Sequence, residues 1–261
     1  MDTSTLALVL LACCATGWFV LAGADIGTGM LLPYLGGSAA ERRLVIASFA
    51  PFFLGNEVWL IATAGVLTGC FPDLEGALLT GQFPALVVLL TGWVVRDLGL
   101  WSRGRGPGRR WRALCDGAVT AGSWTLALAT GWLLTAVLTG RPYEPAGGPV
   151  AVLGALAVAA LFAAHGLSFA ALRLTGVPYE RARRLVGRSR RPWHSFALTA
   201  VLLGGLPLAA GHVLAPGGHA ADPATLRLLV PVLLAVMVPM VAVQAWIWRL
   251  FRHRVTGASY L

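Results

Sequence analysis

Four polar side chains stand in strongly apolar stretches, and their types could do chemistry inside a membrane. Asp25 follows Ala24 in one apolar run, Asn56 and Glu57 come directly before the run VWLIATAGVL, and Arg96 ends another. An ionised side chain at the centre of a bilayer costs about 2.5–3.5 kcal/mol on insertion scales, so it normally faces protein or water. Asp25, Asn56, Glu57 and Arg96 are therefore predicted to serve a proton path or a subunit contact.

Each of these residues also has a simpler interpretation. Asp25, near the cytoplasmic end of the first helix, is either a proton-handling or structurally paired acid, or an acid that snorkels or caps at a helix end. Glu57 either passes protons, with Asn56 orienting it or a water, or is an N-cap acid at the positive end of a helix. The polar residues gathered beside an apolar run favour the first role for Glu57. Arg96 either pairs with Asp25 or Glu57 or is an interfacial anchor, which physics alone favours.

Five further residues are assigned structural roles. Gly27 and Gly29 let another backbone approach closely, and Gly55 and Trp59 flank the polar pair in GNEVW. His165 lies within LFAAHGLSF and could bind haem or a metal, but no second histidine falls within one helical turn. We therefore interpret it as a hydrogen-bonded packing residue and expect this chain to bind no metal and no cofactor.

The elements that must position these residues are membrane-spanning helices. The chain has 261 residues, 57% of them hydrophobic and 12% charged, with a mean hydropathy of +0.74. Several segments reach the roughly 20 apolar residues that cross a bilayer. We predict an all-α polytopic membrane bundle, a single domain over 1–261, with about seven transmembrane helices. Their predicted ranges are 5–24, 45–70, 77–98, 115–138, 149–172, 193–214 and 226–250, and the first could extend to Tyr34.

The basic residues predict the topology. All twenty are arginine. Eighteen of them lie in the tail or in the loops after the first, third and fifth segments, and the two exceptions are Arg141 and Arg227. The other eighteen are Arg42, Arg43, Arg96, Arg103, Arg105, Arg109, Arg110, Arg112, Arg173, Arg181, Arg183, Arg184, Arg188, Arg190, Arg191, Arg249, Arg252 and Arg254. The positive-inside rule places the N-terminus outside and the C-terminus in the cytoplasm. Topology and anionic membrane lipids explain the charge of +9, so no nucleic-acid partner is expected.

The motifs resemble a known family, subunit II of the cytochrome bd-type quinol oxidases. The resemblance covers most of the chain and is most specific at 23–72. It is carried by Asp-x-Gly-x-Gly at 25–29 followed by MLLPYLG, ERR at 41–43, Pro51, GNEVWLI at 55–61, FP at 71–72, Arg96 with Arg103, RWRALCD at 110–116, GS at 122–123, LFAAHGLSFAALRLTG at 161–176 and the final VPMVAVQAWIWRLFRHRV.

The resemblance implies a function for the whole assembly. A member of this family pairs with subunit I, which carries haem b and haem d-type groups, oxidises quinol and reduces dioxygen to water. Subunit II supports that partner and helps shape proton uptake from the cytoplasm. This chain would then be a multi-pass protein of a bacterial plasma membrane, non-catalytic by itself, in contact with lipids and with room for small accessory subunits.

Three departures from the family pattern bear on the proton route. Leu54 stands where the family has the acid associated with proton uptake, in Trp-Asp-Gly-Asn followed by Glu or Gln. The stretch 100–103 lacks the acid of a Phe-acid-aromatic-Arg pattern. The chain is about a quarter shorter than usual members, with seven apolar segments where nine are implied, the missing two falling between 214 and 226. The proton route could then use Glu57 or Asp25, or it could lie wholly within the partner. The other alternative is that this chain belongs to a divergent oxidase.

Two other functions remain open. A small proton-coupled transporter could use Asp25 and Glu57 without a haem partner, although the sequence shows no broken helices paired between its halves. A structural assembly protein could descend from the same family without serving an oxidase, which the leucine at position 54 favours.

Overall fold

The computed structural model describes residues 2–187 and 191–257, and their regular structure is helical. Among these residues, seven helices are long and apolar enough to cross a membrane, so the all-α polytopic prediction is confirmed. They are α1 (Thr3–Met30), α4 (Phe53–Cys70), α6 (Phe83–Ser102), α7 (Arg109–Leu138), α8 (Gly148–Arg173), α10 (Pro192–Leu214) and α11 (Pro223–Leu250). The shorter elements are α2 (Leu32–Leu35), α3 (Ala39–Phe49), α5 (Pro72–Gly81), α9 (Gly176–Val186) and the 3₁₀ helix η1 (Pro216–His219).

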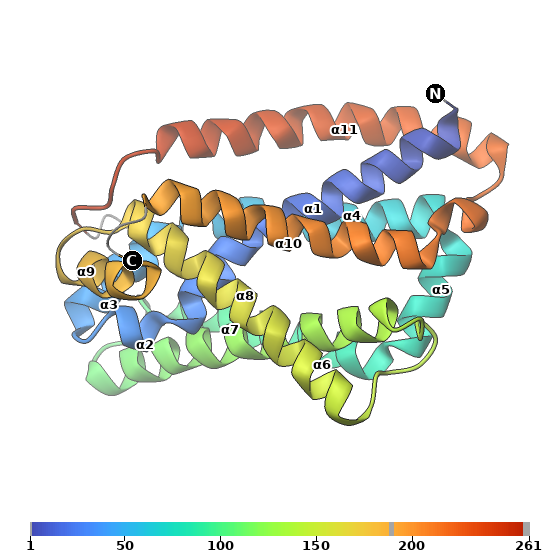
Figure 1. Ribbon diagram of the computed structural model, residues 1–261. Coiled ribbons are helices and arrows are strands. Elements are labelled where there is room, and N and C mark those ends of the chain that lie inside the picture. The colour runs from blue at the N-terminus through green and yellow to red at the C-terminus, as the bar shows by residue number, and fades with distance from the viewer. Residues whose placement is uncertain (1, 188–190, 258–261) are drawn as a thin grey trace.

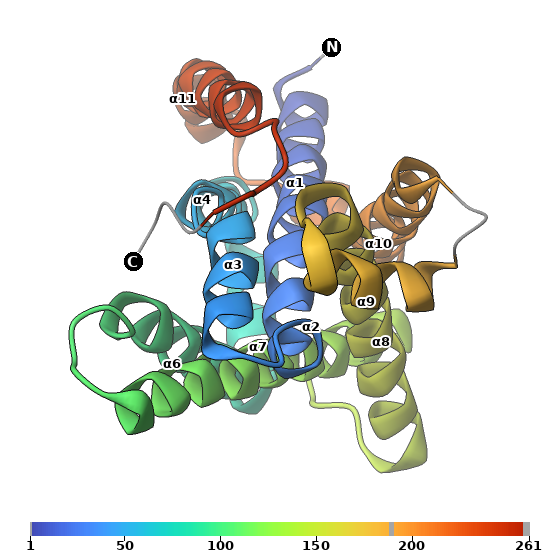
Figure 2. The ribbon, with the colours of Figure 1, turned by 90° about the vertical axis from the view of Figure 1, so that its left-hand side faces the viewer.

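Helix α1 is the centre of the bundle. It packs against α4, α7, α8, α10 and α11, and its nine residues from Ala22 to Met30 are all buried. Figure 2, which looks along the bundle, shows α1 in the middle with these helices around it. This packing places the end of α1 that contains Asp25 where side chains from several helices can reach it.

Caps and prolines fix where helices begin. Asp2 accepts a hydrogen bond from the backbone N–H of Thr5 at 2.9 Å, and Asp222 accepts from Ala224 at 2.9 Å and Thr225 at 3.1 Å. Proline occupies one of the first two positions of α5, α6, α8, α10 and α11. That position needs no intrahelical N–H donor, and proline already has the helical φ.

The helices differ from their predicted ranges at three places. The predicted helix 45–70 is divided into α3 and α4, because Pro51 cannot donate the backbone hydrogen bond that would continue a helix through it. The predicted helix 77–98 is divided at Gln82, and α1 continues beyond 24 to Met30, within the extension to Tyr34 that the sequence allowed. Between α10 and α11 lies only η1, so the two further helices implied for 214–226 are absent.

Two glycines make the closest helix crossing in the bundle. A Cβ atom on Gly27 would lie 1.9 Å from the carbonyl oxygen of Phe162, and one on Gly166 would lie 2.1 Å from the carbonyl carbon of Gly27. The backbones of α1 and α8 therefore approach closely at Gly27 and Gly166. Gly122 allows a similar approach of α7 to α6, since its Cβ would lie 2.5 Å from the backbone nitrogen of Arg96.

The two ends of the bundle differ in content. Figure 1 shows α2, α3, α9 and the C-terminal segment together at one end, with the N-terminus at the other. The clustered arginines of the loops belong to the first end. Arg188 and Arg190 lie outside the described residues. Which end faces the cytoplasm stays a prediction, as does the single-domain assignment.

Candidate functional site

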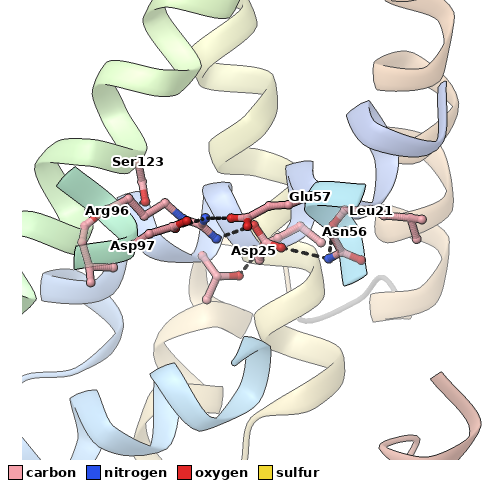
Figure 3. Close-up of polar contacts among 10 residues, drawn as sticks. Leu21, Asp25, Asn56, Glu57, Arg96, Asp97 and Ser123 are labelled. Atoms are coloured by element: carbon pink, nitrogen blue, oxygen red, sulfur yellow. Dashed lines mark hydrogen bonds and ion pairs between the residues drawn. The ribbon is translucent and has the colours of Figure 1, made fainter. Parts of the chain in front are cut away.

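The guanidinium of Arg96 is the centre of a buried ion cluster (Figure 3). Its Nη2 donates to Asp25 Oδ1 at 2.8 Å, and its Nη1 donates to Glu57 Oε1 at 3.0 Å and to Asp97 Oδ1 at 3.1 Å. The side chains of Arg96 and Asp25 are each 1% exposed, that of Glu57 is 11% exposed and that of Asp97 is 21% exposed. The cluster thus has a sealed side at Asp25 and a more accessible side at Asp97.

Three helices supply the cluster, and local packing explains why they converge. Asp25 comes from α1, Glu57 from the second turn of α4, and Arg96 with Asp97 from α6. Gly122 lets α7 pack directly on the backbone of Arg96, which holds α6 against the bundle. The Arg96 guanidinium also lies 5.7 Å from the centre of the Phe53 ring, within the range of a cation–π contact.

An amide chain extends the cluster toward α11. Asn56 Nδ2 donates to Asp25 Oδ2 at 2.8 Å and to the carbonyl of Leu21 at 3.0 Å. Both of these partners accept only, so the amide oxygen of Asn56 is the atom that faces Gln244, whose Nε2 donates to it at 2.9 Å. Trp59 Nε1 donates to Gln244 Oε1 at 3.3 Å. A continuous line of hydrogen bonds therefore runs from α6 through α1 and α4 to α11.

The cluster contains more acids than bases. One guanidinium faces three carboxyl groups, so full ionisation would leave two negative charges without a cation among the residues that contact Arg96. Uncompensated charges away from water are costly. A group with this composition can take up a proton without creating an isolated charge, and it can hold three helices together.

The places of the polar residues within their helices bear on the alternative interpretations of each residue. Asp25 lies inside α1, five residues before the end of that helix, so it is not a cap. Glu57 is not an N-cap, because α4 begins at Phe53 and no side-chain cap bond is present there. Arg96 is one of the most buried side chains and does not anchor the helix at an interface. Leu54 is 51% exposed on the outside of α4, so it takes no part in the cluster.

The remaining residues given structural roles lie around this site. Gly29 faces a side chain rather than a backbone, since its Cβ would lie 2.4 Å from Ser123 Oγ. Gly55 leaves room for side chains of α11, because a Cβ atom on it would lie 3.3 Å from Gln244 Oε1. Trp59 lies over Gly17, where a Cβ would be 2.0 Å from the indole ring. All three positions support the packing of α4 or α1 next to the cluster.

Both nitrogens of His165 are engaged within the bundle. Nε2 is 2.9 Å from the carbonyl oxygen of Val20, which can only accept, so this nitrogen carries the proton. Nδ1 is 2.7 Å from Thr199 Oγ1, and the ring stacks on Phe196 with 4.5 Å between centroids. A ring nitrogen that bonds haem iron must be free of such partners, so His165 does not fit a haem ligand. In the described part of the chain, no three His, Cys, Asp or Glu side chains group to hold a metal ion.

Several buried polar residues were missed by the sequence analysis. Gln244 is 7% exposed and completes the amide chain, and Asp97 adds a third acid to the cluster. A second ion cluster joins Arg103 Nε to Asp116 Oδ1 at 2.5 Å, with Arg42 Nη1 3.5 Å from Asp116 Oδ2. The available signal was a single polar residue within an apolar helix, which Gln244 in VAVQAWIW shows clearly.

The fold and the site define a polytopic helical membrane protein with an ion cluster at the centre of its bundle. Within that class, the chain belongs to the cytochrome bd terminal oxidase subunit II family, whose model matches residues 3–253. The resemblance found in the motifs is thereby confirmed.

Three relatives illustrate this similarity. Cytochrome bd ubiquinol oxidase subunit 2 of Bacillus subtilis is 32% identical over 187 residues, which cover 68% of this chain and 55% of that protein. Cytochrome bd-I ubiquinol oxidase subunit 2 of Escherichia coli (strain K12) is 34% identical over 128 residues, 49% of this chain and 34% of that protein. The probable cytochrome oxidase subunit 2 of Haemophilus influenzae is 28% identical over 189 residues, 67% and 50% of the two chains. The matches thus span between about a third and just over half of these relatives.

Proposed function

We propose that this chain is subunit II of a cytochrome bd-type terminal oxidase in a bacterial plasma membrane. It would bind no haem and would support a subunit I that carries haem b and haem d-type groups. That complex would oxidise quinol and reduce dioxygen to water, with protons taken up from the cytoplasm. Membrane lipids surround it, and small accessory subunits could join it. Family membership and the names of the relatives support this proposal.

The observation that carries the proposal is the buried cluster around Arg96. An oxidase that consumes protons inside a membrane needs ionisable groups away from bulk water, and such groups are rare in membrane helices without a function. Glu57 and Asp97 lie on the accessible side, while Asp25 is sealed. We propose that Glu57 and Asp97 exchange protons, and that Arg96 keeps their charges compensated while they do so.

Asn56 and Asp25 would then position the cluster. Asn56 holds one oxygen of Asp25 while Arg96 holds the other, so the Asp25 carboxylate cannot rotate away from α6. The acid that the family usually has at position 54 would be replaced by Glu57, one helical turn further along α4, where the side chain faces inward. His165 would serve only the packing of α1, α8 and α10.

The test is an affinity purification of the tagged chain from its native membrane, followed by a reduced-minus-oxidised spectrum of the eluate. The proposal predicts haem b and d-type bands together with a larger co-purifying membrane subunit. A control purification of an unrelated tagged membrane protein should give neither. A colourless, stable chain without a partner would contradict the proposal and favour a proton-coupled transporter.

A further inference from the structure

A basic pocket is lined by residues of α3 and of the connection between α6 and α7. Figure 2 looks onto the end of the bundle at which α3 lies. The volume of the pocket is about 540 Å³. Its charged lining residues are Glu41 and Arg43 from α3, Arg103 after α6 and Arg112 from α7. The rest of the lining consists of Ala39, Ala40, Leu44, Thr256 and Gly257. We propose that this pocket binds a phosphate group, and that the headgroup of an anionic phospholipid supplies it.

The pocket has positive charge that the protein does not compensate. Glu41 is engaged by Arg181, and Arg103 is engaged by Asp116. Arg43 and Arg112 are exposed, and within residues 2–187 and 191–257 neither makes an ion pair. Two guanidinium groups without carboxylate partners therefore face one cavity. A guanidinium binds phosphate through parallel, charge-assisted hydrogen bonds, which is why arginine is favoured at phosphate sites.

Contacts within the protein hold the wall of the pocket that the connection between α6 and α7 forms. Trp111 Nε1 donates to the carbonyl of Ser102 at 2.8 Å, and the indole lies so close to Gly106 that a Cβ there would be 2.5 Å away. This ties the first turn of α7, and with it Arg112, to the end of α6. A pocket that is already ordered loses less entropy when it binds a ligand.

The position of the pocket indicates which kind of molecule supplies the phosphate group. Arg103 directly follows α6, which ends at Ser102, and Arg112 lies in the first turn of α7. Both helices are long and apolar enough to cross a membrane, and a pocket at the ends of two membrane-spanning helices would lie at the depth of lipid headgroups. Basic pockets at this depth attract anionic lipids, and each nearby arginine strengthens the attraction.

The experiment measures retained lipid on the purified full-length protein, with its partner subunit if one co-purifies, by native mass spectrometry. Phosphatidylglycerol is added in one series and phosphatidylcholine in another, each with and without inorganic phosphate. The test variant is Arg43→Gln with Arg112→Gln. The matched control is Arg105→Gln with Arg109→Gln, which removes the same charge from exposed residues of the same connection that do not line the pocket.

We expect the test variant to bind phosphatidylglycerol about tenfold more weakly than the unchanged protein, because two charge-assisted contacts are lost. The control should stay within about twofold, and phosphatidylcholine should bind weakly to all three. If inorganic phosphate displaces the lipid, the phosphate group itself is the recognised feature and free phosphate is the alternative source. Equal weakening in both double variants would overturn the proposal, because it would show general attraction to basic charge and no pocket.

Discussion

Arg96 and Asp25 form a 2.8 Å ion pair between α6 and α1, although each side chain is only 1% exposed. The pair cannot be separated from its neighbours, since Arg96 also contacts Glu57 and Asp97, and Asn56 fixes the second oxygen of Asp25. A buried charge of this kind is stable only while its partners remain. The central helix α1 is therefore tied to α4 and α6 by electrostatics as well as by apolar packing.

Removing the cation should destabilise the bundle strongly. We expect Arg96→Gln to lower the free energy of unfolding by about 3–5 kcal/mol, because carboxyl groups are left in a dry site without their cation. Thermal unfolding of the purified protein in one detergent measures this, with exposed Arg105→Gln as the control. Equal unfolding temperatures for the two variants would show that the cluster does not hold the helices together.

The crossing of α1 and α8 should not tolerate a methyl group. Gly27→Ala places Cβ 1.9 Å from the carbonyl oxygen of Phe162, so the helices must move apart. Overpacking of this kind costs about 1–3 kcal/mol or more. Gly65→Ala is the matched control, because nothing lies within 4 Å of a Cβ there. The yield of folded protein and its unfolding temperature should fall for the first variant and stay unchanged or rise for the second.

The histidine contact predicts a smaller effect. Thr199→Val removes the hydroxyl next to His165 Nδ1 and leaves a buried acceptor without a donor, which costs about 1–3 kcal/mol. Thr91→Val removes an exposed hydroxyl that bonds only to the carbonyl of Val87, so it should cost far less. Denaturant or thermal unfolding would compare the two. A loss for Thr91→Val as large as that for Thr199→Val would argue against a specific role for His165.

The contact between Glu41 and Arg181 should make stability depend on pH. The hydrogen bond from Arg181, followed by the one from the backbone of Gly37, lowers the pKa of Glu41 below its ordinary value of 4.5. A lowered pKa in the folded state means that this stabilisation is present above pH 4.5 and is lost as the pH falls through the lowered pKa.

The measurement compares Glu41→Gln with the unchanged protein across pH. The variant should unfold at a lower temperature near neutral pH, and the difference should shrink in acid. Glu180→Gln, an exposed carboxylate next to Arg181 in the sequence, is the control and should show little difference. A difference for Glu41→Gln that stays constant from neutral to acidic pH would contradict the contact.

The sequence predicted the helical class, and it offered a pairing of Arg96 with Asp25 or Glu57 as one of two alternatives for that arginine. It did not show that these three side chains form one cluster together with Asp97. Asp25, Glu57 and Arg96 were found because ionisable residues in apolar runs are costly and therefore conspicuous. Their convergence depends on helix packing through Gly27, Gly122 and Gly166, which a sequence without tertiary contacts does not show. Arg96 does not anchor its helix at an interface, because α1, α4 and α7 pack around it and its side chain is buried.

Other differences have equally specific causes. Pro51 was a visible signal for the break between α3 and α4, but proline is also common inside membrane helices, as Pro207 in α10 and Pro239 in α11 show. Gln244 was missed because one amide in a helix rich in Val, Met and Trp does not change its apolar pattern. The partner of that amide, Asn56, lies 188 positions away.

The central claim is that the buried cluster serves proton uptake by an oxidase, and Glu57→Gln tests it most directly. The amide keeps the shape of the side chain and an acceptor for Arg96 but cannot exchange a proton. Quinol oxidase turnover and haem content of the purified complex would be measured together, with exposed Glu144→Gln as the control. The account predicts at least about tenfold slower turnover with unchanged haem content. Normal turnover in a fully assembled Glu57→Gln complex would contradict it.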